Sequence, residues 1–408
     1  MNIPASADTL QRSARAQPVT STAIVALLML LLLVGLLSGP LLSNALGRDD
    51  WFPDYVDMME NLGHPAGLWR WVLGDLSDLL FYKHEFASIG FLAGAAMAYW
   101  ASRQGKRWRG FDLGQSTPLW PWVMLSSVMG GLLGNLLWGW TVTSRLTGPV
   151  WQPTLVAFVS LPAATVLVYG RGWRVATLGA LAGALLVTPL SLLAVGLVSA
   201  PLNWPSVVGS ALGMGLGTGA GLWLFARFPR WLNRRPRELP SHRGDSPKGA
   251  GALSSLSWWL RRALADFTEG LFCANEWASL GLIAGTWLAW AFNPLAPARG
   301  SALLPELFAG QLLAALLAVW VWRRRWQAMG WYPTYVPLVS VVPAAIFLLG
   351  GGWTVVVGSA VAGALLAPPL AAAIIGRLPS GLHRCVGSFL GMALSVLLIL
   401  PPLALLAA

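Results

Sequence analysis

Two similar stretches of the chain carry acidic residues at matching positions, and these carboxylates are the groups best suited to chemistry. One stretch reads LLFYKHEFASIGFLAG and the other reads GLFCANEWASLGLIAG, 191 residues further along. The matched acids are Asp75 with Asp266, Asp78 with Glu269, and Glu85 with Glu276. Carboxylates in an apolar environment can hold protons or cations, so the matched acids are the candidates for ion chemistry in the two halves of the chain.

Glu85 and Glu276 each stand at the first turn of an apolar segment. As a structural cap, such a carboxylate is stabilised by free backbone N–H groups and by the positive end of the helix dipole. As an intramembrane carboxylate, it would instead serve as a proton or cation site. The preceding residue is His84 in one stretch and Asn275 in the other, and an unperturbed histidine titrates near physiological pH. Both interpretations stay open, and in the second the two sites would be tuned differently.

The other four acids lie on two amphipathic segments, residues 68–82 and 258–272. Apolar residues recur there at helical spacing, but charge interrupts both segments too often for either to span a membrane alone. Each is therefore expected to be an interfacial helix or a re-entrant half-helix. We predict that these four carboxylates form the wet face of such helices.

A pair of Pro-Thr motifs is the second constellation with chemical potential. WQPTLVAFVS begins at Trp151 and WYPTYVPLVS begins at Trp331, 180 residues later. Proline removes a backbone donor and frees a carbonyl, so these segments are expected to be broken or kinked near mid-membrane. The prolines that define the break are Pro153, Pro162, Pro333 and Pro343. The freed carbonyls could line a polar site together with Thr154, Thr334, Ser160 and Ser340. A kink tolerated in a packed helix is the alternative.

Composition places all these groups in a membrane protein. Of the 408 residues, 56% are apolar and only 11% charged, with a mean hydropathy of +0.63, whereas a globular protein has about a quarter charged residues. Eleven apolar runs approach the length of about 20 residues that a membrane helix needs. They lie near 23–46, 86–102, 118–142, 151–170, 173–199, 206–228, 277–293, 304–322, 332–350, 353–375 and 385–406. The predicted class is an all-α polytopic membrane protein.

The basic residues predict the orientation. With the N-terminus in the cytoplasm, the inside segments hold 22 of the 27 Lys and Arg residues, as the positive-inside rule requires. The topology is therefore predicted to be N-in and C-out. The net charge of +11 follows from these loops, so nucleic acid is not an expected partner.

The matched stretches predict an internal duplication. A third pair, VGSALGMG and VGSFLGMA, keeps the same order at an offset of 178 residues. Each copy has five spans, an odd number, so the second copy must enter the membrane from the opposite face. The predicted parts are a cytoplasmic tail (1–22), an N-terminal transmembrane helix (23–46), an external acidic loop (47–66), a first five-helix repeat (67–228), a cytoplasmic linker (229–255) and a second five-helix repeat (256–408).

Inverted repeats are a recurrent plan of secondary transporters. We therefore expect a permease that moves a small polar solute by alternating access, with a proton or cation as the coupling ion. A passive channel, or the membrane subunit of a multi-component transporter, is the alternative, and a membrane-embedded enzyme ranks below both. No catalytic or zinc-binding motif is visible, and the two cysteines exclude a disulfide framework. No enzyme activity, metal or other cofactor is predicted. The lipid bilayer is the expected partner, and both a homo-oligomer and a partner subunit stay open.

Two short stretches carry a resemblance to a known family. The segments PTLVAFVSLPAATVLVYGRGWR and EFASIGF are similar to stretches of the YhfT-type inner-membrane permeases. The resemblance implies a multi-pass transport protein of a bacterial-type inner membrane. It implies no binding residues.

Overall fold

Every regular element of the described chain is a helix. The computed structural model describes residues 52–114, 117–138, 153–236 and 256–407, and no strand occurs within them. Five helical segments are long and apolar enough to cross a membrane. They are Trp173–Ser199, Ser206–Arg227, Leu304–Met329, Trp353–Ile375 and Cys385–Ala407. These segments agree with the predicted class of helical membrane protein. The predicted tail 1–22, the span 23–46 and most of the linker lie outside the described residues.

The first half of the described chain forms a series of helices between residue 55 and the linker. Short α3 (Tyr55–Glu60) comes first, with Asp54 and Asp57 forming a reciprocal capping box at its start. The longer members follow as α4 (Pro65–Asp75), α5 (Glu85–Arg103), α6 (Trp120–Trp138), α8 (Leu161–Tyr169), α9 (Trp173–Ala182), α10 (Thr188–Ala194), α11 (Ser206–Arg227) and short α12 (Pro229–Leu232). The π-helical turn Gly183–Val187 joins α9 to α10, and a second one, Val195–Ser199, extends α10, so Trp173–Ser199 is one continuous helical segment.

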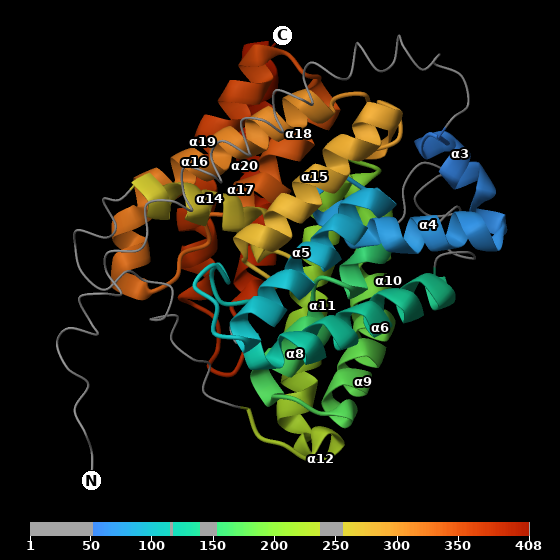
Figure 1. Ribbon diagram of the computed structural model, residues 1–408, viewed down its shortest axis with the longest axis vertical. Helices are drawn as coiled ribbons and strands as arrows, with labels where there is room; N and C mark the ends of the chain where they lie inside the picture. Colours follow the sequence, from blue (N-terminus) through green and yellow to red (C-terminus); the bar gives the residue numbers. More distant parts are fainter. Residues whose placement is uncertain (1–51, 115–116, 139–152, 237–255, 408) are drawn as a thin grey trace.

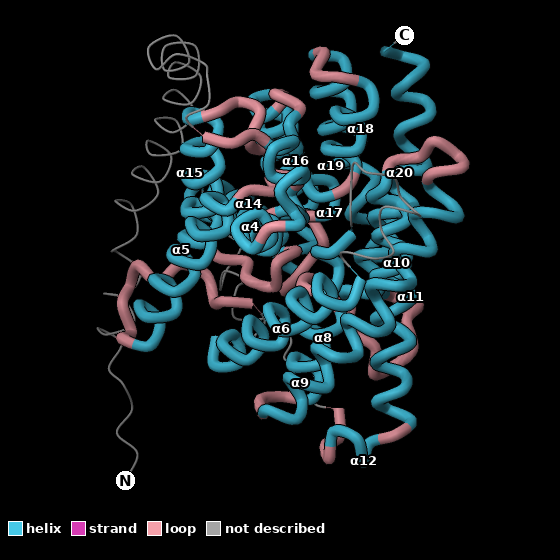
Figure 2. Tube along the Cα trace, turned by 90° about the vertical axis from the view of Figure 1, so that its right-hand side faces the viewer, coloured by secondary structure: helices cyan, strands magenta, loops and turns pink. Residues whose placement is uncertain are grey.

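The second half of the described chain begins after the linker. Its helices are α14 (Leu256–Glu269), α15 (Glu276–Phe292), α16 (Leu304–Met329), α17 (Val336–Val339), α18 (Val341–Leu349), α19 (Trp353–Ile375) and α20 (Cys385–Ala407). In Figures 1 and 2 the helices α16, α18 and α19 group above α6, α8 and α9. Contacts of α5 with α15 and of α11 with α20 join the two halves, and one hydrophobic core contains residues of both.

The two Pro-Thr segments are interrupted helices in the centre of the protein. In the first, the turn Pro153–Ala157 is followed by Ser160, whose φ of −139° and ψ of −117° are not helical, and then by α8. In the second, Ser340 separates α17 from α18 in a similar way. Pro162 occupies the first turn of α8, where proline's missing N–H leaves no hydrogen bond broken. Almost every described side chain of both segments is buried, so the breaks face protein and not lipid.

Helices α5 and α15 cross in an antiparallel manner and lie side by side in Figure 1. Gly90 stands against Gly281, and a Cβ at either position would come within 2.0 Å of the other's carbonyl oxygen. The flanking contacts are Gly94 with Trp277 and Gly285 with Phe86. Residues 191 positions apart are equivalent in the two halves. Exchanging equivalent residues converts the Gly94–Trp277 contact into the Gly285–Phe86 contact and leaves the Gly90–Gly281 contact unchanged. Small residues four apart allow such close approach of two backbones.

Candidate functional site

In the first half, a buried cluster of one cation and several hydrogen-bond donors surrounds the Asp75 carboxylate. Lys83 forms an ion pair with Asp75, and its Nζ lies 3.6 Å from the centre of the Trp71 indole ring. Thr154 Oγ1 donates to Asp75 Oδ1 over 3.1 Å, and Asn135 Nδ2 donates to Asp75 Oδ2 over 2.8 Å. The Trp71 Nε1–H donates to Thr154 Oγ1 over 3.0 Å. Both oxygens of this carboxylate are therefore held by the protein.

The second half builds the same cluster around Asp266. Arg262 Nη2 lies 2.8 Å from Asp266 Oδ1, and its guanidinium lies 4.8 Å from the ring centre of Trp326. Trp326 Nε1 donates to Thr334 Oγ1 over 3.2 Å, and Thr334 lies beside Asp266. Carboxylate, cation, indole and threonine recur together, although the cation and the indole come from positions that do not match those of the first half.

Three of the four carboxylates expected on a wet face are buried, so for them that expectation is wrong, whereas the fourth, Glu269, is partly buried. Asp75, Asp78 and Asp266 are each only 1% exposed. Helices α4 and α14 are amphipathic, but their polar faces turn toward the helices packed on them, α5 and α6 for α4 and α15 and α16 for α14. A buried charge is tolerated when a partner of opposite charge and further hydrogen bonds satisfy it, and each of these clusters supplies both.

The second matched pair of acids, Asp78 and Glu269, differs between the halves. Asp78 Oδ1 accepts from Arg299 Nε over 3.0 Å and from Arg299 Nη2 over 2.8 Å, so its partner comes from the other half. Glu269 accepts from Arg262 on its own helix over 2.9 Å and from Trp331 Nε1 over 2.9 Å. Trp151, which matches Trp331, lies outside the described residues. The second acid of the first half is thus bound by a residue of the other half, whereas Glu269 is bound by residues of its own half.

Glu85 lies at the start of α5 and pairs with an arginine that sequence reasoning missed. Arg70 Nε donates to Glu85 Oε1 over 2.6 Å. His84 Nδ1 accepts from the backbone N–H of Phe86 over 3.1 Å and lies 3.6 Å from Glu85 Oε2. Within the described residues neither Glu85 Oε2 nor His84 Nε2 has a hydrogen-bond partner.

Glu276 occupies the matching place at the start of α15, with its environment more completely satisfied. Arg261 Nε donates to Glu276 Oε1 over 2.7 Å, and the backbone N–H of Phe111 donates to Glu276 Oε2 over 2.7 Å. Asn275 accepts from the Trp277 N–H over 2.9 Å. Arg70 and Arg261 are themselves 191 residues apart, so the register that matched the acids would have found both arginines.

The predicted site residues do not gather in one place. Thr154 and Thr334 join Asp75 and Asp266, not the glutamates at the helix starts. The hydroxyls of Ser160 and Ser340 donate to carbonyls of the preceding turn, those of Val156 over 2.5 Å and Val336 over 2.7 Å. These serines therefore satisfy freed carbonyls at the breaks. Among the described residues, the predicted site residues are thus divided between the ion pairs of Glu85 and Glu276, the clusters around Asp75 and Asp266, and the hydrogen bonds of Ser160 and Ser340 at the helix breaks.

The loops before α5 and α15 are strained in the same way in both halves. Phe81 and Phe272 have positive φ of 67° and 56°, and Lys83 and Ala274 have 44° and 54°. Side chains other than glycine rarely adopt this conformation, which costs about 1–3 kcal/mol at each residue. Behind each loop a hydroxyl pair, Ser77 with Ser88 and Thr268 with Ser279, ties the turn to the helix start. Because the same backbone strain occurs in both halves, these two turns are candidates for functional elements.

Comparisons with protein families and with curated proteins found no match for this chain at a significant level. Among the described residues, no group of three or more His, Cys, Asp or Glu side chains is arranged to hold a metal ion.

Proposed function

We propose that this protein is a secondary transporter built from two inverted five-helix repeats, 67–228 and 256–408, preceded by the membrane helix 23–46. In this proposal eleven spans cross a bacterial-type inner membrane with the N-terminus inside and the C-terminus outside. The protein moves a small polar solute, with a proton or cation as the coupling ion.

The antiparallel crossing of α5 and α15 is the observation that carries the proposal. Gly90 faces Gly281, and the flanking contacts exchange when the halves are exchanged. A twofold axis that relates two antiparallel helices runs across them, so for helices that cross a membrane it lies near the membrane plane. This is the symmetry that lets one protein alternate between outward-open and inward-open forms by swapping the conformations of its halves.

The buried charges supply elements that can differ between two such forms. The matched ion pairs of Glu85 with Arg70 and of Glu276 with Arg261 stand at the starts of the two crossing helices. Glu85 is the better candidate for coupling, because its Oε2 faces His84 and has no hydrogen-bond partner among the described residues. Glu276 has both oxygens occupied, so it suits a structural cap.

Uptake into sealed vesicles that contain the purified protein tests the proposal. Small organic acids, sugars, amino acids, amines and nucleosides are screened with and without a proton or sodium gradient, and empty vesicles serve as the control. Saturable uptake that collapses with the gradient supports a coupled transporter. Flux that does not saturate and ignores the gradient would favour a channel. A complete lack of flux from a well-folded preparation, with an ATPase co-purifying from the native membrane, would favour the subunit of a larger transporter.

A further inference from the structure

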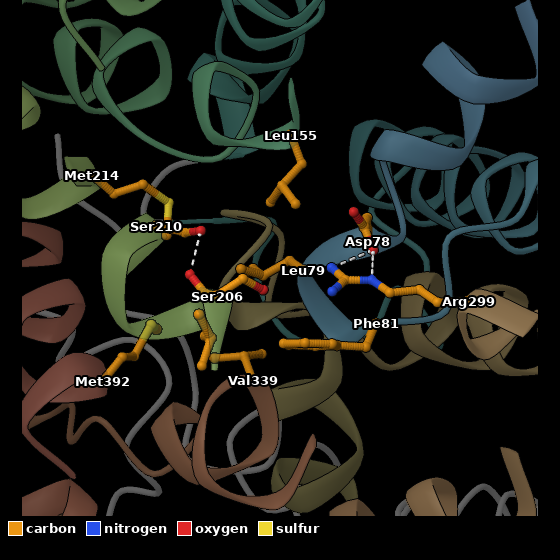
Figure 3. A pocket seen from close by; sticks show the side chains of 11 residues that line it. Asp78, Leu79, Phe81, Leu155, Ser206, Ser210, Met214, Arg299, Val339 and Met392 are labelled. Carbon is orange, nitrogen blue, oxygen red and sulfur yellow. Dashed lines mark hydrogen bonds and ion pairs between the residues drawn. The ribbon is translucent and has the colours of Figure 1, made fainter. Parts of the chain in front are cut away.

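A small cavity lies between the two halves (Figure 3). The first half contributes Asp78 and its neighbours together with the beginning of α11, and the second half contributes Arg299, Val339 and Met392. Met214 and Met392 both line it, and these two methionines are matched residues, 178 positions apart. The cavity therefore sits across the line that relates the halves, where an alternating-access transporter holds its solute.

Asp78 is the charged acceptor at this cavity. Both hydrogen bonds from Arg299 end on Oδ1, and Figure 3 shows the other oxygen pointing away from Arg299. Oδ2 is buried and has no hydrogen-bond partner within the described part of the chain. A buried charged oxygen without a donor is costly. It marks a place for a ligand that donates a hydrogen bond.

The remaining walls narrow the class of ligand. Leu79, Leu155, Val207 and Val339 make most of the lining apolar, so a bare alkali ion would find too few oxygens to replace its water. An anion would lie against the Asp78 carboxylate, whose charge opposes it, while Arg299, which also lines the cavity, already donates two hydrogen bonds to that carboxylate. An ammonium group on a short carbon skeleton meets both conditions, because the nitrogen donates to the carboxylate and the carbons contact the apolar walls.

We propose that this cavity binds a small organic ammonium ion, whose N–H group donates to Asp78 Oδ2 while its carbon atoms pack between Leu155 and Val339. The proposal rests on the proposed function, for which it names the class of solute. Ser206 and Ser210 also line the cavity, and the Ser210 hydroxyl donates to the Ser206 carbonyl over 2.8 Å.

Arg299 is the group that such a ligand must compete with. It reaches Asp78 from a loop in which Ala298, Arg299 and Ala302 all have positive φ, between 52° and 59°. Backbone strain of this kind lowers the cost of leaving the observed conformation. A second cation at Asp78 weakens the ion pair with Arg299, so ammonium binding and movement of this loop are coupled.

Equilibrium binding to the purified full-length protein in detergent tests the inference without needing transport. Isothermal titration and thermal stabilisation are measured with ethylammonium chloride, with ethanol as its neutral isostere, with sodium acetate as an anion, and with sodium chloride at equal ionic strength. Saturable binding of ethylammonium alone is expected. Because the four solutes are compared on the unmodified protein, the outcome does not depend on any variant folding. Stabilisation by acetate or by sodium chloride alone, or no saturable binding of ethylammonium, would overturn the proposal.

Variants locate the bound probe. Asp78→Asn should weaken ethylammonium binding about tenfold or more, the effect of losing a charged hydrogen bond. Asp112→Asn is the matched control, since this carboxylate is half-exposed and its nearest arginine nitrogen lies 3.9 Å away. Arg299→Gln should leave binding intact or tighter, because a competing cation is removed. A loss of binding in Arg299→Gln would show an anion site and refute the ammonium site. If ethylammonium fails to bind while vesicles still take up another solute in a gradient-dependent manner, the ligand class is wrong and the proposed function stands.

Discussion

Replacement of Gly90 or Gly281 by alanine should destabilise the protein through one shared contact. At either position the new Cβ would lie 2.0 Å from the facing carbonyl oxygen, whereas an ordinary contact begins at 3.4 Å. The helices must therefore separate locally by about 1.4 Å, or distort, and overpacking of this kind costs about 1–3 kcal/mol. Alanine's higher helix propensity offsets at most about 1 kcal/mol of that cost.

Thermal unfolding in detergent, followed by the fraction that stays monodisperse on size-exclusion chromatography, measures the effect. Gly90→Ala and Gly281→Ala should lower the apparent melting temperature by similar amounts, because each new Cβ would meet the other residue's carbonyl oxygen at the same distance. The double variant should lose less than the sum, since one separation of the helices relieves both clashes. Gly219→Ala is the control, because its Cβ would lie 3.7 Å from the nearest atom, a Val386 methyl. If all three single variants melt alike, the close crossing of α5 and α15 is refuted.

The remaining predictions concern the buried charges. Asp75→Asn and Lys83→Met should each destabilise the protein by about 3–5 kcal/mol, because either change leaves a buried charge unpaired. The double variant should recover much of that loss in the same melting assay, and simple additivity would contradict the buried pair. Glu85→Gln should abolish gradient-driven uptake while expression stays normal, whereas Glu276→Gln should act mainly on stability. Normal gradient-driven uptake in Glu85→Gln would remove this carboxylate from the coupling mechanism.

The order of the helices was accessible from the sequence because hydrophobic runs and proline breaks are local signals. Four of the five helical segments that are long and apolar enough to cross a membrane begin and end within one residue of a predicted run, for example α20 at Cys385–Ala407 against the predicted 385–406. The fifth, α16, continues to Met329, seven residues past the predicted end at 322. Interruptions at Ser160 and Ser340 follow from the prolines nearby. The Gly90/Gly281 crossing also had a signal, since GFLAG and GLIAG both place two glycines four residues apart. That spacing is common in membrane helices, so the sequence alone could not show that these two segments pack against each other.

The burial of the aspartates was not accessible in the same way. Periodicity shows that α4 and α14 have a polar face, but it cannot show what covers that face. The cations that neutralise Asp75 and Asp266 come from different positions, Lys83 in the loop before α5 and Arg262 on α14. A comparison of equivalent positions in the two halves therefore does not find these two cations. Arg299 reaches Asp78 across 221 positions of sequence, a distance over which no local pattern carries information.

Labelling of two introduced cysteines by a membrane-impermeant maleimide tests the inverted repeats most directly. Gln104, the C-cap of α5, and Leu295, just beyond the end of α15, are both exposed. The native Cys273 and Cys385 are buried and provide an unreactive background. Inverted repeats predict that Leu295→Cys is labelled from outside intact cells and Gln104→Cys only after the membrane is opened. Labelling of both positions from the same side would contradict the inverted arrangement and, with it, the proposed alternating access.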